Sequence, residues 1–371
     1  MKIYDVIIIG GGLAGLTLAI DLSLSGIEVL LFEKEGYPKH KVCGEYVSNE
    51  VRPYLYRLGI DISETNADEI KRLALSNIDG NSVKVDLPTG GFGISRYALD
   101  NLLYEKAKSN GVEFIFETVV DIKFHENQFC VKTNELEYYS EIAIGSYGKR
   151  SNLDKKFKRD FIQQTTPWIG IKGHYESSDF PKGEVQLHNF EGGYCGLSRT
   201  ETGAVNFCYL AHYESFKKES SIERFNHNVL AKNPNLKSFL DRSILLFDKH
   251  LAISQVSFQN KNAVENHILM AGDSAGLIHP LCGNGMAMAI HSAKLIAEEI
   301  KDFQNHKKRN LLEEKYTQVW TKTFQKRLIF GFIFQKLLLK PKLTNVGMKL
   351  VSKSPFLLQK MIQQTHGSPI S

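Results

Sequence analysis

A glycine-rich turn that directly follows an apolar run is the feature that most constrains this chain. Residues 3–9 are suited to a buried strand, and Gly10, Gly12 and Gly15 follow it before an apolar helical segment. In this setting Gly10 permits a tight turn, Gly12 lets a pyrophosphate approach the backbone, and Gly15 allows close packing of helix on strand. The N–H groups and the dipole at the helix start favour a phosphate. The sequence therefore predicts a dinucleotide-binding strand–helix unit.

The next apolar segment, residues 27–32, ends at an acidic residue. Glu33 stands at the spacing expected for a carboxylate that binds the ribose hydroxyls of adenosine, and Lys34 follows it. A carboxylate at this place favours an unphosphorylated ribose. FAD or NAD is therefore expected at this site rather than NADP.

The pattern along the chain predicts an α/β fold in which a nucleotide-binding lobe is built from both ends of the sequence. A helix is expected after Ser95, which suits an N-cap, and it should end at Asn110 and Gly111. An irregular stretch is expected before it, to about residue 90. The expected domains are a discontinuous FAD-binding, Rossmann-like domain (1–165 and 259–305), a β-rich substrate domain (166–258) and a helical C-terminal segment (306–371).

Composition excludes several other classes of protein. The five cysteines are scattered without metal-type spacing, so we expect reduced thiols and no metal site. No charge-free stretch of about 18 residues suits a membrane-spanning helix, and a cytoplasmic location is expected. Nucleic acid is not expected as a partner.

The C-terminal segment is basic and apolar at the same time. No Asp or Glu follows Glu314, whereas ten Lys or Arg residues lie between Lys315 and Lys360, among apolar runs such as residues 328–334. This pattern is typical of helices that lie on an anionic membrane surface or contact an acidic carrier protein. A helical subdomain that packs its apolar face on the body and keeps its lysines in water explains the pattern equally well.

A second glycine-rich segment, residues 272–290, makes a family resemblance specific. Together with the first glycine turn, it resembles the FAD-dependent monooxygenase superfamily of para-hydroxybenzoate hydroxylase type, in particular the branch of geranylgeranyl reductases and halogenases. The resemblance implies that Asp273 binds the ribityl hydroxyls of FAD. It also implies that the turn 283–286 aims N–H groups and a helix start at the flavin, where negative charge develops on reduction.

Two further segments carry the resemblance. Residues 41–48 resemble the KxCGxxxS stretch that passes close to the flavin ring in geranylgeranyl reductases, and Arg96 matches an arginine that opens a helix near the cofactor. The implied cofactor-binding residues are Gly10, Gly12, Leu13, Ala14, Gly15, Glu33, Lys34, Cys43, Gly44, Arg96, Val119, Gly272, Asp273, Pro280, Gly283, Asn284, Gly285 and Met286.

The sequence also departs from the family pattern. Tyr147 stands where many hydroxylases have an aspartate that contacts both flavin and NAD(P)H, so the electron donor is either NAD(P)H or a separate reductase. The halogenase hallmark of paired tryptophans is missing, because Trp occurs only at positions 168 and 320.

No sequence motif identifies a catalytic residue other than the flavin. Candidates on segments that face the cofactor in the family are Cys43, Tyr194, His188 and His279, with Trp168 and Cys195 as further lining residues. The sequence favours an FAD-dependent hydroxylase that acts on a hydrophobic phenolic, polyketide-derived or lipid-like molecule. The alternatives are geranylgeranyl-reductase-like reduction of carbon–carbon double bonds, a halogenase-like reaction on a carrier-bound substrate, and a non-catalytic flavin-binding protein that docks a partner.

Overall fold

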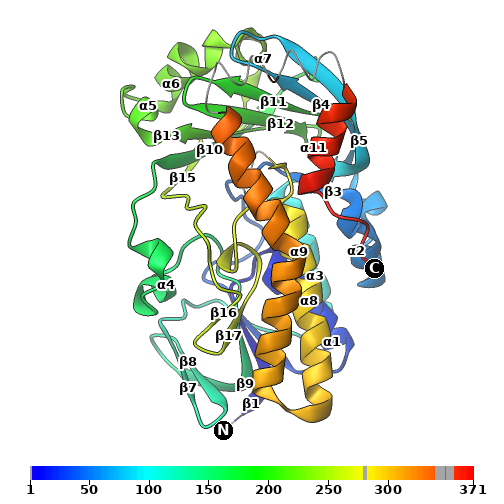
Figure 1. Ribbon diagram of the computed structural model, residues 1–371, viewed down its shortest axis with the longest axis vertical. Coiled ribbons are helices and arrows are strands. Elements are labelled where there is room, and N and C mark those ends of the chain that lie inside the picture. Colours follow the sequence, from blue (N-terminus) through cyan, green and yellow to red (C-terminus); the bar gives the residue numbers. More distant parts are fainter. Residues whose placement is uncertain (1, 279–281, 339–346, 348–354) are drawn as a thin grey trace.

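The computed structural model describes residues 2–278, 282–338, 347 and 355–371 and contains two β-sheets (Figure 1). The first has the strand order β16-β17-β9-β1-β2-β6, and all its neighbours are parallel except β16 and β17. Parallel strands that are covered on both faces read as continuous apolar runs, as residues 3–9 do. The strands are β1 (Ile3–Ile9), β2 (Val29–Phe32), β6 (Glu113–Ile115), β9 (Glu137–Gly145), β16 (Val264–Glu265) and β17 (Ile268–Met270), with the hairpin β7 (Asp121–His125) and β8 (Gln128–Lys132) attached to β9.

Three helices pack together beside the first sheet: α1 (Leu13–Leu24), α3 (Arg96–Ser109) and α8 (Gly285–His306). The helix predicted after Ser95 is confirmed, because the Ser95 hydroxyl accepts a hydrogen bond from the Ala98 N–H at 3.0 Å. It ends before Gly111, which has a φ of 87°. The mixed α/β architecture expected from the sequence is confirmed.

The second sheet has the order β14-β10-β13-β12-β11-β4-β5-β3, with β15 paired to β10. Three short helices, α5 (Tyr213–Phe216), α6 (Ile222–Asn228) and α7 (Pro234–Asp241), lie at one end of the molecule beside this sheet (Figure 1). The strands are β3 (Tyr46–Ser48), β4 (Asp68–Ser76), β5 (Ser82–Gly93), β10 (Trp168–Glu176), β11 (Glu184–Phe190), β12 (Gly193–Arg199), β13 (Val205–His212), β14 (Ile244–Leu245) and β15 (Leu251–Ser254).

The expectation of an irregular stretch up to about residue 90 was wrong. Strands β4 and β5 lie in this stretch and belong to the second sheet, where β4 pairs in parallel with β11, more than a hundred residues away. The first half of β4 is largely exposed and the second half buried, so it lacks the regular alternation that identifies a strand. Short elements fill the remaining links: η1 (Asn49–Val51), α2 (Arg52–Arg57), η2 (Ile62–Thr65), α4 (Asn152–Lys156), η3 (Asp160–Ile162), η4 (Leu230–Lys232) and η5 (Gly272–Ser274).

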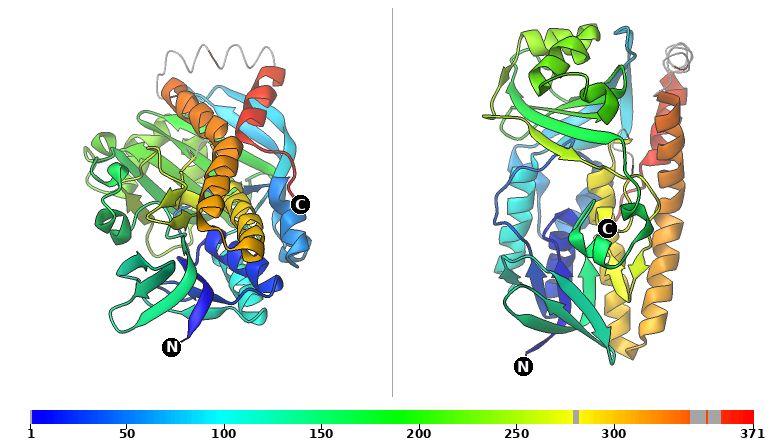
Figure 2. Two further views of the ribbon diagram at one scale, coloured as in Figure 1. Left: turned by 60° about the horizontal axis from the view of Figure 1, so that its bottom comes forward. Right: turned by 90° about the vertical axis from the view of Figure 1, so that its left-hand side faces the viewer.

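Two C-terminal helices connect the two sheets. Helix α9 (Arg309–Leu338) lies beside α8 and runs along the length of the molecule, and α11 (Pro355–Thr365) packs on β5 (Figures 1 and 2). Leu358 and Ile362 of α11 join the apolar cluster formed by Leu73 and Val85 of the second sheet. Among the described residues, no helix combines the length and the low charge that crossing a bilayer requires.

Candidate functional site

The three glycines of the first turn have separate structural roles. Gly10 has a φ of 109°, and a Cβ there would lie 2.5 Å from the Ser146 carbonyl oxygen. A Cβ on Gly15 would lie 2.1 Å from the Gly10 oxygen, so this glycine permits the close packing of α1 on β1. A Cβ on Gly12 would meet only the Arg96 guanidinium, at 3.9 Å. Gly12 therefore faces open space.

That open space belongs to a cavity of about 1020 Å³ between the two sheets. Gly10, Gly12, Leu13 and Ala14 line it at the start of α1, where no side chain caps the helix N-terminus. The uncapped N–H groups are available to an anion.

Glu33 lines the same cavity at the end of β2 and is 8% exposed. Its carboxylate accepts hydrogen bonds from the Gly11 N–H at 3.0 Å and from Lys39 Nζ at 2.8 Å. Lys34 also borders the cavity, and it pairs with Glu35. The acidic group predicted to meet the ribose is therefore held in place next to the glycine turn.

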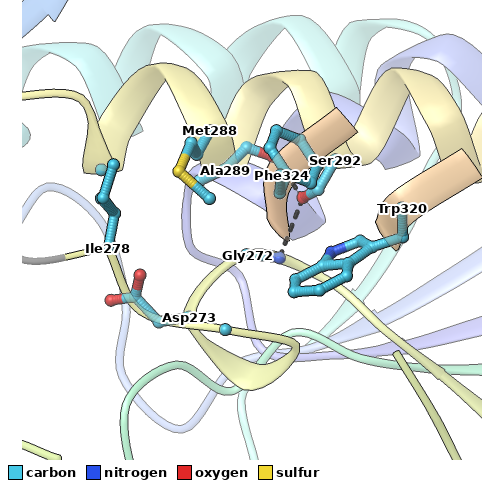
Figure 3. A pocket seen from close by; sticks show the side chains of 10 residues that line it. Gly272, Asp273, Ile278, Met288, Ala289, Ser292, Trp320 and Phe324 are labelled. Atoms are coloured by element: carbon cyan, nitrogen blue, oxygen red, sulfur yellow. Dashed lines mark hydrogen bonds between the residues drawn. The ribbon is translucent and has the colours of Figure 1, made fainter. Parts of the chain in front are cut away.

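Asp273 lies in η5, directly after β17, and borders the cavity with Gly272. Ser292 Oγ accepts a hydrogen bond from the Gly272 N–H at 2.9 Å, and Trp320 of α9 packs against this loop (Figure 3). Lys261 Nζ donates to the Asp273 carbonyl at 2.7 Å, and burial lowers the pKa of Lys261 to about 8. Four other elements, α8, α9, the 257–262 loop and the chain around Gly148, thus support the Asp273 loop.

The start of α8 borders the cavity with Gly283, Gly285 and Met286. Asn284 is fully buried and does not line the cavity; its side chain donates hydrogen bonds to Glu50 and to the Thr365 carbonyl. Pro280 and His279, which the sequence named as a cofactor-binding residue and a catalytic candidate, lie outside the described residues.

Residues 41–45 and the start of α3 form the wall opposite the glycine turn. Cys43, Gly44 and Arg96 line the cavity. The Arg96 guanidinium makes two hydrogen bonds to the Asp100 carboxylate, at 2.6 and 2.7 Å. Val119, also predicted from the resemblance, lines the cavity as well.

The same cavity extends away from the glycine turn, and we call this part the apolar arm. The arm lies between the second sheet and the two C-terminal helices. Its lining is mostly apolar, and Thr365 and His366, at the end of α11 and just after it, are polar lining residues. The apolar residues that line it are Leu73, Leu75, Leu87, Val185 and Leu187 from the sheet, and Phe330, Leu358, Met361 and Ile362 from α9 and α11.

The structure separates the catalytic candidates. Tyr194 and Cys43 line the cavity, whereas His188 does not: it is 3% exposed and contacts Ser76 Oγ at 2.7 Å and Gln186 Oε1 at 2.9 Å. Burial lowers the pKa of His188 to about 4, so it is neutral near pH 7. Trp168 does not line the cavity. Cys195 does not line it either, because strand alternation turns Cys195 to the other face, where it packs in a separate apolar cluster.

Sequence reasoning missed a buried charge cluster next to Cys43. Glu45 and Lys172 form an ion pair, and both are fully buried. His174 Nε2 contacts the second carboxylate oxygen of Glu45 at 2.6 Å. His40, Glu45 and His174 lie close enough to share a metal ion, and Glu45 already pairs with Lys172 and His174 there. The sequence signal that could have predicted this cluster was Lys172, a lysine within a largely apolar strand, because a buried lysine requires a charged partner.

The fold and the cavity define a flavoprotein oxidoreductase of the FAD-binding, two-sheet type. The residues fit the cofactor, because Gly12 leaves open space before an uncapped helix start, Glu33 stands beside it, and the cavity is of ligand size. Over residues 3–326 the chain matches the FAD binding domain family, and it belongs to that family. FAD is its cofactor.

Curated relatives and solved structures agree with this assignment. The chain is 24% identical to a menaquinone reductase of Mycobacterium tuberculosis over 79% of this chain and 76% of the relative. It is 26% identical to digeranylgeranylglycerophospholipid reductase 1 of Methanosphaera stadtmanae, over 85% of this chain and 80% of the relative. A flavin-dependent brominase structure superimposes with a TM-score of 0.78 at 16% identity, covering 98% of this chain and 93% of that one. The brominase shares the fold.

Proposed function

We propose that this protein is an FAD-dependent reductase of carbon–carbon double bonds in a lipid that carries a long, isoprenoid-type chain. The observation that carries the proposal is the apolar arm of the cavity. A hydrocarbon chain gains about 0.8 kcal/mol for each CH₂ group that it buries, whereas a polar chain would lose its hydrogen bonds to water there. The arm therefore favours a long apolar substrate over a compact polar one.

We infer that the adenosine and pyrophosphate of FAD bind at Glu33, Gly12, Leu13 and Ala14, and that Arg96, Asp273, Gly283 and Met286 border its flavin half. Residues 1–165 and 259–305 would then hold the cofactor, apart from β3, β4 and β5, which extend the second sheet. Residues 166–258 would supply the other strands of the substrate wall, and 306–371 would close the arm.

The protonation states of two lining side chains do not choose between reduction and hydroxylation. Once reduced by an electron donor, bound FAD would supply the hydride. Burial raises the pKa of Cys282 to about 12 and that of Tyr194 well above its usual value, so both side chains keep their protons at neutral pH. A raised pKa makes each group a weaker acid, so neither side chain is tuned to donate a proton at neutral pH.

The names of two relatives support reduction as the proposed reaction. The names of the menaquinone reductase and the digeranylgeranylglycerophospholipid reductase both designate reductases, and the second names a lipid with geranylgeranyl chains. Hydroxylation, which the sequence favoured, and halogenation use the same cofactor, so the experiment must separate them from reduction.

The test follows the mass of the product. Holoprotein is photoreduced without oxygen, which removes the need for a known electron donor, and mixed with a geranylgeranyl lipid. We expect reoxidation of the flavin together with a product that has gained two hydrogen atoms. Gain of an oxygen atom, in air with a long-chain phenol, would indicate a hydroxylase. Gain of a halogen, in air with chloride or bromide added, would indicate a halogenase. No product with any of these substrates would favour a flavin-binding docking protein.

Filling the arm tests the substrate proposal separately. Met361→Trp adds volume inside the arm, and we expect turnover of a geranylgeranyl substrate to fall about tenfold or more while a short prenyl substrate is still turned over. Gln363→Trp on the exposed side of the same helix is the matched control, because Gln363 is exposed and does not line the cavity. Equal loss with both substrate lengths would show that the arm does not hold the chain.

A further inference from the structure

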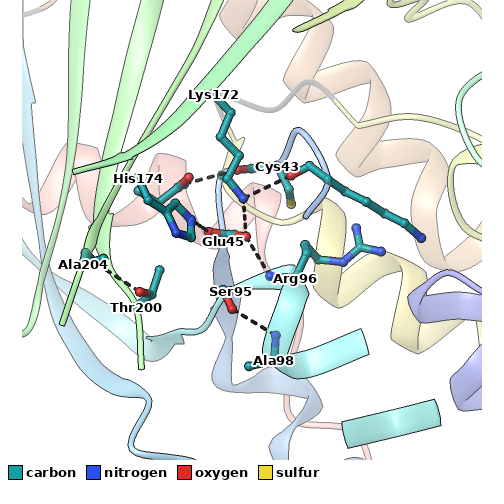
Figure 4. A network of polar contacts seen from close by, with 12 residues as sticks. Cys43, Glu45, Ser95, Arg96, Ala98, Lys172, His174, Thr200 and Ala204 are labelled. Atoms are coloured by element: carbon teal, nitrogen blue, oxygen red, sulfur yellow. Dashed lines mark hydrogen bonds and ion pairs between the residues drawn. The ribbon is translucent and has the colours of Figure 1, made fainter. Parts of the chain in front are cut away.

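The segment 41–45 is held from the substrate side of the molecule. Lys172 of β10 donates one hydrogen bond to the Lys41 carbonyl, at 3.1 Å, and pairs with the Glu45 carboxylate (Figure 4). The Glu45 carboxylate also accepts a hydrogen bond from the Arg96 backbone N–H at 2.7 Å and contacts His174. The two ends of the segment are therefore fixed by the same ammonium group.

The carbonyl groups between these ends are held in the same way. Asn206 Nδ2 of β13 donates to the Cys43 carbonyl at 3.2 Å, and Ser198 Oγ of β12 donates to the Gly44 carbonyl at 3.1 Å. Lys172, Ser198 and Asn206 are each fully buried. We call these three residues the loop clamp.

The clamp decides which side of the segment faces the cofactor. Because the carbonyl groups of Lys41, Cys43 and Gly44 all have donors from the second sheet, they are turned toward that sheet. Cys43 and Gly44 also line the cavity, so part of their surface is open to it. Glu45 has a φ of 53°, a conformation that residues other than glycine rarely adopt, so this orientation depends on the surrounding contacts.

We propose that Lys172, Ser198 and Asn206 are positioning residues that orient the 41–45 segment toward the bound flavin ring, so that the substrate sheet sets the environment of the cofactor. The inference rests on FAD as the cofactor and on no particular reaction. A failure of the proposed double-bond reduction would therefore leave it untouched.

The experiment compares two probes that share one half of the binding site. ADP contains the adenosine and pyrophosphate, which suit Glu33 and Gly12, whereas FAD also carries the ring that the proposal places beside segment 41–45. For full-length apoprotein with Ser198→Ala or Asn206→Ala, we expect the Kd for FAD to rise roughly two- to tenfold, as for the loss of one hydrogen bond. The Kd for ADP should stay within about twofold, and the visible absorption bands of bound FAD should shift.

A matched control separates positioning from general destabilisation. Asn233 is also fully buried, and its side chain donates to the Asn77 and Asn189 carbonyls, away from segment 41–45. Asn233→Ala should lower the unfolding midpoint without changing either Kd or the flavin spectrum. The proposal is overturned if both clamp variants keep the wild-type Kd and spectrum, or if FAD and ADP lose affinity equally. Ser198→Ala removes only one hydroxyl, so it remains informative if Asn206→Ala does not fold.

Discussion

Single residues in the glycine turn separate cofactor binding from folding. A Cβ on Gly12 would meet open cavity, whereas a Cβ on Gly15 would overlap the Gly10 carbonyl. The same residue type therefore serves two purposes three positions apart, and two alanine variants should distinguish them.

We expect Gly12→Ala to leave the unfolding of the apoprotein unchanged and to raise the Kd for FAD by about tenfold or more, or about 1.4 kcal/mol, because the methyl group occupies the phosphate approach. Gly15→Ala should instead destabilise the apoprotein by about 1–3 kcal/mol through overpacking. Flavin fluorescence titration and urea unfolding measure the two effects. If Gly12→Ala unfolds like Gly15→Ala, the turn does not leave space for a ligand.

Lys261 gives a pH-dependent prediction at the same scale. Burial lowers its folded-state pKa from 10.5 to about 8. Between these pH values the unfolded chain binds more protons than the folded protein, so this group makes stability rise with pH from about 8 to about 10.5. Its penalty below pH 8 is on the order of 3 kcal/mol.

Lys261→Met removes the charge and keeps most of the apolar stem. The free energy of unfolding of the wild type, relative to this variant, should increase between about pH 7 and about pH 9.5 in urea experiments. A parallel pH dependence of the two proteins would mean that Lys261 is not desolvated in the folded state.

At the scale of elements, one buried carboxylate links the C-terminal region to the residue that precedes helix α8. Glu50 of η1 pairs with Arg327 of α9 at 3.0 Å and accepts hydrogen bonds from the Gly367 N–H and from Asn284. Asn284 precedes α8, whose first residues border the cavity. Glu50 therefore couples the wall of the arm to the cofactor side.

Glu50→Gln should destabilise the protein by about 2–4 kcal/mol, because it leaves the Arg327 guanidinium without its partner. Glu28→Gln is a suitable control, since Glu28 pairs with Lys2 at the surface and its side chain is 49% exposed; it should cost less than about 1 kcal/mol. Urea unfolding of both variants tests this. A Glu50 variant as stable as the control would exclude the coupling.

At the scale of the whole molecule, apolar side chains are exposed where α9 ends and α11 begins. Ile329, Phe332 and Ile333 of α9 are about half exposed, as is Phe356 of α11, and the two helices contact one another. This part of the chain carries ten Lys or Arg residues and no acidic residue after Glu314. We propose that this surface binds an anionic membrane peripherally. The same two helices line the arm on their inner side.

Replacement of Phe332, Ile333 and Phe356 by Ser should weaken binding to anionic liposomes about tenfold or more, because each apolar side chain contributes to interfacial binding. Ile244→Ser is the control, since Ile244 is 67% exposed on β14 of the second sheet. Co-sedimentation at low and high salt measures the effect. Equal binding of the triple variant and the control would instead favour an acidic carrier protein as the partner.

A further question at the scale of the whole molecule is which electron donor reduces the flavin. Tyr147 lines the cavity where related hydroxylases have an aspartate, and its hydroxyl lies 3.6 Å from the Met270 sulfur. We therefore propose a separate reductase as the donor, and bleaching of the flavin by NADPH alone would argue against it.

The sequence by itself determined the cofactor and the elements that are defined locally. The glycine turn, Glu33 and the Ser95 cap each depend on a few consecutive residues whose backbone geometry has a fixed chemical purpose, and their pattern is visible without a structure. The tertiary structure decided the rest. β4 entered the second sheet through its pairing with β11, and His188 was placed away from the cavity by strand alternation. The apolar arm and the loop clamp combine residues from strands and helices far apart in the chain, and only long-range packing brings such residues together.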